Sequence, residues 1–289
     1  MVKRKIIQSC AALLMNAHFS GFITGGIYRG NLKKLCVPGL NCYSCPGALG
    51  ACPIGSIQAL AGNPRTLVSF YVYGFLVTIG LFFGRAVCGF LCPFGLIQEL
   101  LNKIPLKNWR GKRVFRYLAK LKYVILAFMV IGIPTALTLG GRISFPVFCE
   151  YLCPAGTLEA GVPLTIANDM LRGSLGWLFV WKIAILIIVI LLAIKIYRPF
   201  CRFLCPLGAI YSLFNRISIL NIKKDETKCD GCHTCRDVCR MEAQNPVDME
   251  CIRCGDCVRH CPKKALCWSG WNQRPLLPVI EKSAKRNNA

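Results

Sequence analysis

The sequence predicts a mostly α-helical membrane protein of about four transmembrane helices, followed by a small α+β domain. The chain has 289 residues, of which 54% are hydrophobic, yet its formal net charge is +23. So much apolar content beside so much positive charge requires that the two be segregated, as in a membrane protein with basic loops. Four apolar stretches predict the helices, and the cysteine spacing after residue 222 predicts the small domain.

The four apolar stretches each approach the ~20 residues that cross a ~30 Å hydrocarbon core. They cover residues 6–28, 66–87, 122–140 and 175–197. At that length in lipid only a helix satisfies its own backbone. The first stretch is the least apolar, because Gln8, Asn16 and His18 interrupt it. We therefore expect a four-helix membrane domain over 1–221, and a basic C-terminal tail over 269–289.

Basic residues gather on alternate loops. Residues 85–121 carry eight Lys or Arg against Glu99 alone, and the segment from Arg198 on carries sixteen. The loops 29–65 and 141–174 are poorer in positive charge. The positive-inside rule then places both termini in the cytoplasm of a bacterial inner membrane, with these two loops outside. Membrane lipid is thus an expected partner. Nucleic acid is not, because the apolar stretches have no place in a soluble nucleic-acid binder.

Two cysteine runs of one spacing, C-x2-C-x2-C-x3-C, lie over 229–239 and 251–261. Such a pair is typical of ferredoxins with two [4Fe–4S] clusters, in which the fourth cysteine of each run binds the cluster of the other run. Zinc favours paired Cys-x2-Cys elements and leaves the third and fourth cysteines unexplained. We therefore expect a ferredoxin-like domain over 222–268 with two clusters. Cluster A takes Cys229, Cys232, Cys235 and Cys261, and cluster B takes Cys251, Cys254, Cys257 and Cys239.

A second motif, Cys-Pro-x-Gly, occurs four times in the membrane part. The copies begin at Cys52, Cys92, Cys153 and Cys205, and the last three follow another cysteine by four residues, at Cys88, Cys149 and Cys201. Residues four apart share one helix face. The proline then restarts the helix beside the sulfurs, where a helix N-terminus favours thiolates. The copies alternate between outside and inside, which indicates two similar halves.

The orientation pairs these motifs. Four inner thiols, those of Cys88, Cys92, Cys201 and Cys205, could hold one [4Fe–4S] cluster at the inner face. Six cysteines lie outside, at Cys36, Cys42, Cys45, Cys52, Cys149 and Cys153. Cys45 or Cys42, with Cys52, Cys149 and Cys153, could hold another cluster, and disulfides are the alternative in an oxidising compartment. We therefore expect one or two clusters beyond A and B, with iron bound through these cysteines.

The Cys88-x3-Cys92-Pro and Cys201-x3-Cys205-Pro motifs, combined with the double cysteine run, resemble the NapH/NosR group of membrane-bound ferredoxin-type proteins. The resemblance covers residues 66–265, and NapH has the same layout of four spans and a cytoplasmic two-cluster domain. It implies quinol oxidation, or delivery of electrons across the membrane to periplasmic partners. The extra cysteines at 36–52 and 149–153 depart from the simpler pattern and favour direct cluster-to-cluster transfer.

These observations predict a membrane-bound iron–sulfur protein that relays electrons between a cytoplasmic or quinol donor and an extracytoplasmic acceptor. It would serve as the electron-transfer subunit of an oxidoreductase, with redox proteins and a quinone as partners and no catalytic side chain of its own. Two alternatives stay open at this point. One is a redox-active assembly or regulatory factor for another metalloenzyme, and the other is a zinc-binding membrane scaffold.

Overall fold

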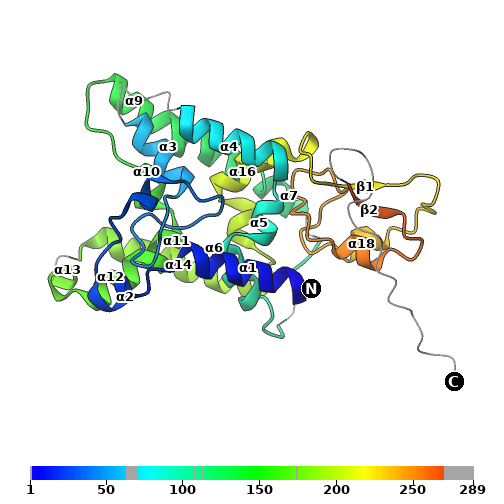
Figure 1. The fold of residues 1–289 in the computed structure, drawn as a ribbon, viewed down its shortest axis with the longest axis horizontal. Helices are drawn as coiled ribbons and strands as arrows, with labels where there is room; N and C mark the ends of the chain where they lie inside the picture. Colours follow the sequence, from blue (N-terminus) through cyan, green and yellow to red (C-terminus); the bar gives the residue numbers. More distant parts are fainter. Residues whose placement is uncertain (1, 63–69, 107–108, 112, 174, 270–289) are drawn as a thin grey trace.

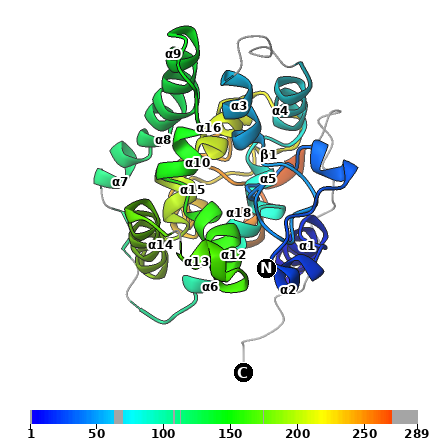
Figure 2. The same cartoon turned by 90° about the vertical axis from the view of Figure 1, so that its left-hand side faces the viewer.

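The computed structural model describes residues 2–62, 70–106, 109–111, 113–173 and 175–269. Residues 270–289 of the predicted basic tail therefore lie outside the described residues. The molecule is elongated, with helices along most of its length and a small sheet at one end (Figure 1). The view along that axis shows α4, α8–α9, α14 and α1 around the periphery, with the short helices α5, α10, α15 and α16 nearer the centre (Figure 2).

Short helices and apolar helices alternate along the chain. The first half comprises α1 (Val2–Met15), α2 (Ser20–Thr24), η1 (Asn31–Lys34), α3 (Pro53–Ala61), α4 (Phe70–Phe83), α5 (Ala86–Phe90), α6 (Pro93–Leu101), α7 (Arg113–Leu118), α8 (Leu121–Ile125), η2 (Leu126–Gly132) and α9 (Ile133–Leu139). The second half comprises α10 (Val147–Tyr151), α11 (Pro154–Gly156), η3 (Thr157–Gly161), α12 (Val162–Ala167), α13 (Asp169–Gly173), α14 (Trp177–Lys195), α15 (Pro199–Phe203), α16 (Pro206–Leu213) and η4 (Phe214–Arg216).

Two helical stretches among the described residues are long and apolar enough to cross a membrane, Val114–Leu139 and Trp177–Lys195. Both are mostly exposed on the protein, so their apolar side chains face outward as lipid requires. They match the predicted spans 122–140 and 175–197. Of the predicted span 66–87, the described part forms the shorter apolar helix Phe70–Phe83, and residues 66–69 lie outside the described residues.

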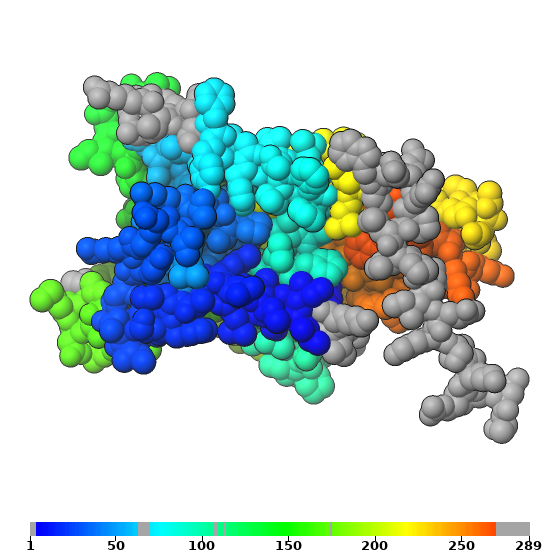
Figure 3. Space-filling view, in the orientation of Figure 1, coloured from blue at the N-terminus to red at the C-terminus, as the bar shows by residue number. Residues whose placement is uncertain are grey.

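The prediction of one continuous helix over 6–28 is wrong. The chain ends α1 at Met15 and restarts as α2 at Ser20. The physical reason lies in the polar residues that interrupt the stretch, because Gln8, Asn16 and His18 all bond to the protein. Gln8 Nε2 donates to the Cys92 carbonyl at 2.8 Å, and His18 Nδ1 lies 2.9 Å from the Pro46 carbonyl. The N-terminal segment packs along the helical body (Figure 3).

The C-terminal part is a small α+β unit. Strand β1 (Asn221–Lys224) pairs antiparallel with β2 (Leu266–Ser269), and Ile222 stands opposite Trp268. Between the strands lie α17 (Thr234–Asp237) and α18 (Asp256–His260), which pack against each other. The sheet thus closes a loop-rich segment that holds both cysteine runs, at the end of the molecule away from α12 and α13 (Figure 1).

Candidate iron–sulfur sites

Every Cys-Pro-x-Gly motif ends one element and begins the next helix. Helices α3, α6, α11 and α16 each start on the proline, with the cysteine at the N-cap in extended conformation. In three of them the thiol accepts from the glycine N–H at 3.4 Å. Proline suits the first helical position because it needs no N–H partner there. The predicted placement of sulfurs at helix N-termini is therefore what the structure has.

The inner tetrad, which we define as Cys88, Cys92, Cys201 and Cys205, comes together from α5, α6, α15 and α16. All four residues are buried. Burial raises the pKa of the Cys92, Cys201 and Cys205 thiols, and the negative charge of the Cys88 thiolate raises each of them further. Cys201 acts on Cys92 and Cys205 in the same way. The four thiols are therefore buried close enough to one another for their charges to interact.

The outer tetrad is formed by Cys42, Cys52, Cys149 and Cys153. Burial raises the pKa of Cys52 to about 11 and that of Cys149 to about 12, and charge coupling links Cys52 to Cys42 and Cys149 to Cys52. Burial also raises the pKa of Cys153, followed by the charges of Cys149 and Cys42. A Cβ atom on Gly156 would lie 3.6 Å from Cys42 Sγ and 3.8 Å from Cys153 Sγ, so the glycine keeps the space beside both sulfurs open.

Cys42 and Cys45, the two cysteines that the sequence leaves open, have different partners in the structure. Cys45 lies next to Cys42, but its thiol donates to Asn16 Oδ1 at 3.6 Å. Cys36, the sixth outer cysteine, bonds to Ser56 Oγ at 3.8 Å. Both therefore point into contacts outside the tetrad. All twenty cysteines fall within the described residues, and each is a free thiol there.

A glutamine braces each tetrad in the same way. Gln98 Nε2 donates to Cys201 Sγ at 3.1 Å and its Oε1 accepts from the Phe200 N–H at 3.1 Å. Gln58 Nε2 donates to Cys149 Sγ at 3.1 Å and its Oε1 accepts from the Phe148 N–H at 2.8 Å. Each glutamine thus ties one half of its tetrad to the other. Sequence reasoning missed both, although the repeated Cys-Pro-x-Gly-x-Ile-Gln at Cys52–Gln58 and Cys92–Gln98 could have revealed them.

A buried ionic network surrounds the inner tetrad. Glu99 pairs with Arg4 at 2.7 Å and with Arg198 at 2.6 Å, and Tyr197 Oη donates to it at 2.6 Å. Burial disfavours the carboxylate, but Arg198 and Arg4 outweigh it and lower the pKa of Glu99 to about 2. Arg4 also donates to the Gly89 carbonyl at 2.9 Å. The N-terminal helix therefore holds the loop that carries the inner cysteines.

Set B, our name for Cys239, Cys251, Cys254 and Cys257, faces the helical body. Burial raises the pKa of Cys257, and the charges of the other three thiolates raise it further. Asn215 holds the loop that carries the second cysteine run, because its Nδ2 donates to the carbonyls of Asp248 at 2.9 Å and Cys251 at 2.8 Å. Asn215 Oδ1 also accepts from the Arg85 N–H at 2.9 Å. The structure thus brings Cys239 of the first run to the second run.

Set A, our name for Cys229, Cys232, Cys235 and Cys261, is the more open of the two. Cys232 is exposed and the other three are half-buried. Cys232 Sγ accepts from Thr234 Oγ1 at 3.5 Å, and Cys261 Sγ accepts from the Ala265 N–H at 3.3 Å. The packing of α17 on α18 brings the element with Cys235 to the one that leads into Cys261. Set A therefore lies toward solvent and set B toward the membrane part.

The outer loop reaches back toward the inner tetrad. Tyr211 Oη on α16 donates to the Pro38 carbonyl at 3.0 Å. A Cβ atom on Gly39 would lie only 3.2 Å from Cys92 Cα, so this loop is in backbone contact with an inner motif. One continuous core contains cysteines of three sets: Cys239 and Cys254 of set B, Cys88, Cys92 and Cys205 of the inner tetrad, and Cys52, Cys149 and Cys153 of the outer tetrad. These three sets therefore lie along one packed interior.

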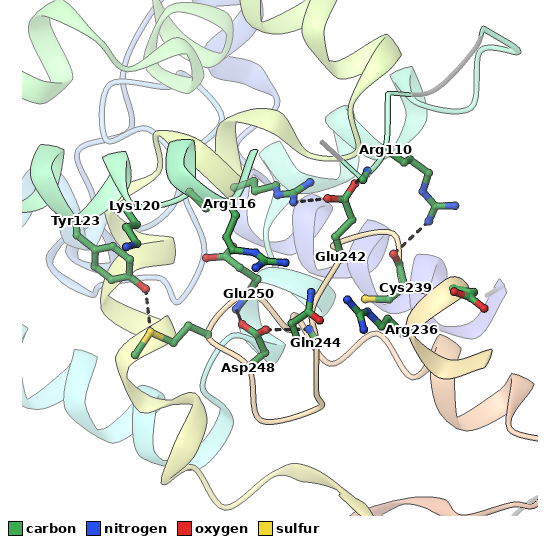
Figure 4. Close-up of a pocket in the computed structure, with 15 residues that line it drawn as sticks. Arg110, Arg116, Lys120, Tyr123, Arg236, Cys239, Glu242, Gln244, Asp248 and Glu250 are labelled. Carbon is green, nitrogen blue, oxygen red and sulfur yellow. Dashed lines mark hydrogen bonds and ion pairs between the residues drawn. The ribbon is translucent and has the colours of Figure 1, made fainter. Parts of the chain in front are cut away.

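A cavity of about 630 Å³ opens beside set B (Figure 4). One wall is helical and carries Arg116, Lys120 and Tyr123, and the facing wall carries Arg236 on α17 and Cys239 just after it (Figure 4). Arg110 Nη2 donates to the Cys239 carbonyl at 3.2 Å. Side chains of both charges line this cavity: Arg110, Arg116, Lys120, Arg202 and Arg236 beside Asp237, Glu242, Asp248 and Glu250.

The donor sets fit [4Fe–4S] clusters. Among the described residues, no three His, Cys, Asp or Glu side chains close around a single metal ion. A cubane instead takes each of its four thiolates on a different iron, so its ligands stand farther apart than those of one ion. Four thiols, glycines that leave space beside the sulfurs, and donors to the sulfurs suit that group.

Gly89 provides a test of how tightly set B packs on the inner motif. A Cβ atom on Gly89 would lie 2.5 Å from the Ile252 carbonyl oxygen, which belongs to the set B loop. We therefore expect Gly89→Ala to lower the thermal midpoint of the purified protein, at an overpacking cost of about 1–3 kcal/mol. Gly74→Ala is the matched control in α4, because its Cβ would meet nothing within 4 Å. Equal midpoints for the two variants would contradict this packing.

The comparisons with known proteins agree with this chemistry. The family described as "4Fe-4S binding domain" matches residues 64–113, 121–162 and 177–224, which hold the three Cys-x3-Cys-Pro motifs. No solved structure matches the chain.

Three relatives show how much of the chain is shared. An uncharacterized protein of Methanocaldococcus jannaschii is 30% identical over 75% of this chain and 86% of its own length. The ferredoxin-type protein NapH of Haemophilus influenzae is 24% identical over 90% of this chain and 85% of NapH. The regulatory protein NosR of Stutzerimonas stutzeri is 28% identical over 76% of this chain but only 28% of NosR. The chain therefore belongs to the NapH/NosR-like family of ferredoxin-type iron–sulfur proteins.

Proposed function

We propose that this ferredoxin-type electron-transfer protein holds four [4Fe–4S] clusters in a line, with set A, set B, the inner tetrad and the outer tetrad as their ligands. The observation that carries the proposal is the continuous core shared by the last three sets. Each cluster, when bound, takes up and gives back one electron. The chain supplies the ligands, keeps water out and fixes the spacing between the sites.

The order of the sets follows from their burial. Cys232 of set A is exposed, whereas Cys251 of set B and the inner cysteines are buried. Set A, with its exposed Cys232, is therefore the side that a redox partner reaches first. We further propose that this side is cytoplasmic and that the outer tetrad serves an extracytoplasmic acceptor. Both termini then lie in the cytoplasm, with the chain in the cytoplasmic membrane.

A quinol is the alternative donor that the predicted layout allows. A quinol-oxidation assay in membranes that contain the full chain, with and without Cys88→Ser, tests it. Loss of activity in the variant supports a quinol donor, and equal activity excludes a role of the inner tetrad in quinol oxidation.

Iron analysis of anaerobically purified protein tests the proposal as a whole. We expect about 16 iron atoms per chain, four from each of four clusters, and reducible EPR signals. About eight iron atoms would leave only the C-terminal pair occupied and would refute the two clusters in the membrane part. Zinc in place of iron, without a reducible signal, would refute the function altogether.

A further inference from the structure

Arg85 and Arg198 each stand three residues before the first cysteine of an inner motif, and each reaches across to the other motif. Arg85 Nη2 donates to the Cys201 carbonyl at 3.1 Å, and Arg198 Nη1 donates to the Cys88 carbonyl. The motif glycines make room for them. A Cβ atom on Gly95 would lie 3.0 Å from Arg198 Nη1, and one on Gly208 would lie 3.6 Å from Arg85 Nη2.

Both guanidinium groups are fully buried, at 0% exposure. Arg85 pairs with Glu250, which Lys122 shares, and Arg198 pairs with Glu99, which Arg4 shares. Four cations thus face two carboxylates in this network. Among the described residues, Nε of Arg85 and Nε of Arg198 have no hydrogen-bond partner. A buried excess of positive charge is costly unless an anion compensates it.

The outer tetrad lacks this feature, although its glutamine brace is the same. Pro146 takes the place that Arg85 and Arg198 hold in the inner motifs, three residues before Cys149. Three charged side chains lie near the outer tetrad, and each bonds to a backbone group. Lys182, half-buried, donates to the Cys149 carbonyl at 3.3 Å, Lys33 donates to the Ala48 carbonyl, and the Glu159 carboxylate accepts from the Cys42 N–H. Of the two tetrads, only the inner one therefore has such an arginine pair among the described residues, and Arg85 also donates to the Met249 carbonyl of the set B loop at 2.7 Å.

We propose that Arg85 and Arg198 are positioning residues that raise the midpoint potential of the cluster in the inner tetrad. The inference rests on the proposed function, which places a [4Fe–4S] cluster there. Reduction adds one electron to a group that is already an anion, with no bond made or broken in the chain. Nearby buried cations stabilise the more negative state most, because charge interactions are strong where water is excluded. The cluster in the inner tetrad is therefore reduced in preference to the one in the outer tetrad. Onward transfer to the outer tetrad then requires a low-potential donor.

Two substitutions that should shift the midpoint potential in opposite directions test the proposal by EPR-monitored redox titration of the full, anaerobically purified protein. We expect Arg198→Gln to lower the midpoint of the inner signal, with about a tenfold loss in the reduced-to-oxidised ratio at fixed potential, which is about 59 mV for one electron. We expect Glu99→Gln to raise that midpoint, because it leaves Arg4 and Arg198 without their carboxylate. Arg198→Lys keeps the charge and should lie between Arg198→Gln and the unmodified protein.

Arg172→Gln is the matched control, because Arg172 is 58% exposed and its contacts, an ion pair with Asp169 and a hydrogen bond to the Ile166 carbonyl at 3.2 Å, are local to α13 and the turn before it. It should leave every midpoint unchanged. Unshifted inner midpoints in both Arg198→Gln and Glu99→Gln would overturn the proposal. Loss of the inner iron from both variants would assign the network a purely structural role, and would overturn it as well. If the Cys88→Ser and Cys201→Ser variants each show every EPR signal of the unmodified protein, the inner tetrad holds no cluster and the proposed function itself fails.

Discussion

Replacing Cys42 by serine should remove about four iron atoms per chain, whereas replacing Cys45 by serine should remove none. The two residues are three positions apart on one loop, and each is an equal candidate from spacing alone. In the structure Cys42 couples with Cys149 and its N–H is held by Glu159 Oε2 at 2.8 Å. Cys45 instead donates to Asn16. Iron analysis with EPR of both variants measures the difference directly.

This pair of variants separates ligation from a general effect on the loop. Both cysteines lie within the packed loop and both substitutions are nearly isosteric, so a loss of fold would affect both. Loss of iron from Cys45→Ser together with full iron in Cys42→Ser would reverse the assignment of the outer ligands. Full iron in both variants would show that the outer tetrad holds no cluster. A spectrum that keeps the other signals in Cys42→Ser would confirm that only one site is lost.

Cysteine spacing predicted the local geometry of the Cys-Pro-x-Gly motifs, and the four ligand sets stay a prediction. The proline makes the cysteine before it an N-cap, as at Cys92, whereas Cys88 lies on the preceding helix α5 and not on the same helix as Cys92. The choice of Cys42 over Cys45 could not be predicted in this way. It depends on Asn16, a residue 29 positions from Cys45 that only the tertiary fold brings near.

Hydropathy failed over residues 6–28 for a related reason. An apolar helix face looks the same in sequence whether lipid or protein covers it. Gln8 and Arg4 lie on the face of α1 that is buried against the inner motif, while apolar residues such as Leu13 and Leu14 lie on its exposed face. The arginine network was equally hidden. Arg85 was counted only as part of a basic loop, and its partner Glu250 is 165 residues away.

Asn215→Ala should detach the set B loop from the helical body. Asn215 is fully buried and is the only side chain that the described residues show bonding at once to Asp248, Cys251 and Arg85. Its removal takes away the partner of the Cys251 carbonyl and of the Arg85 N–H, while the Asp248 carbonyl still accepts from the Cys251 N–H at 3.0 Å. Each buried unpaired group costs about 1–3 kcal/mol. We therefore expect faster hydrogen exchange over residues 248–254 and loss of iron from set B.

Asn221→Ala is the matched control for this experiment. Asn221 Oδ1 accepts only from the adjacent Ile222 N–H at 2.8 Å, so its loss is local to β1. Exchange over 248–254 should then stay at the level of the unmodified protein. If Asn215→Ala also keeps that level, the bonds of Arg85 to the Met249 carbonyl and to Glu250 hold the loop without help from Asn215. Asn215→Ala could lower the hydrogen-exchange protection of residues 248–254 while the inner EPR signal keeps its midpoint potential. That result would show that different contacts set the docking of the loop and the potential of the inner cluster. It is the result we expect, because the described contacts of Arg198 and Glu99 do not include this loop.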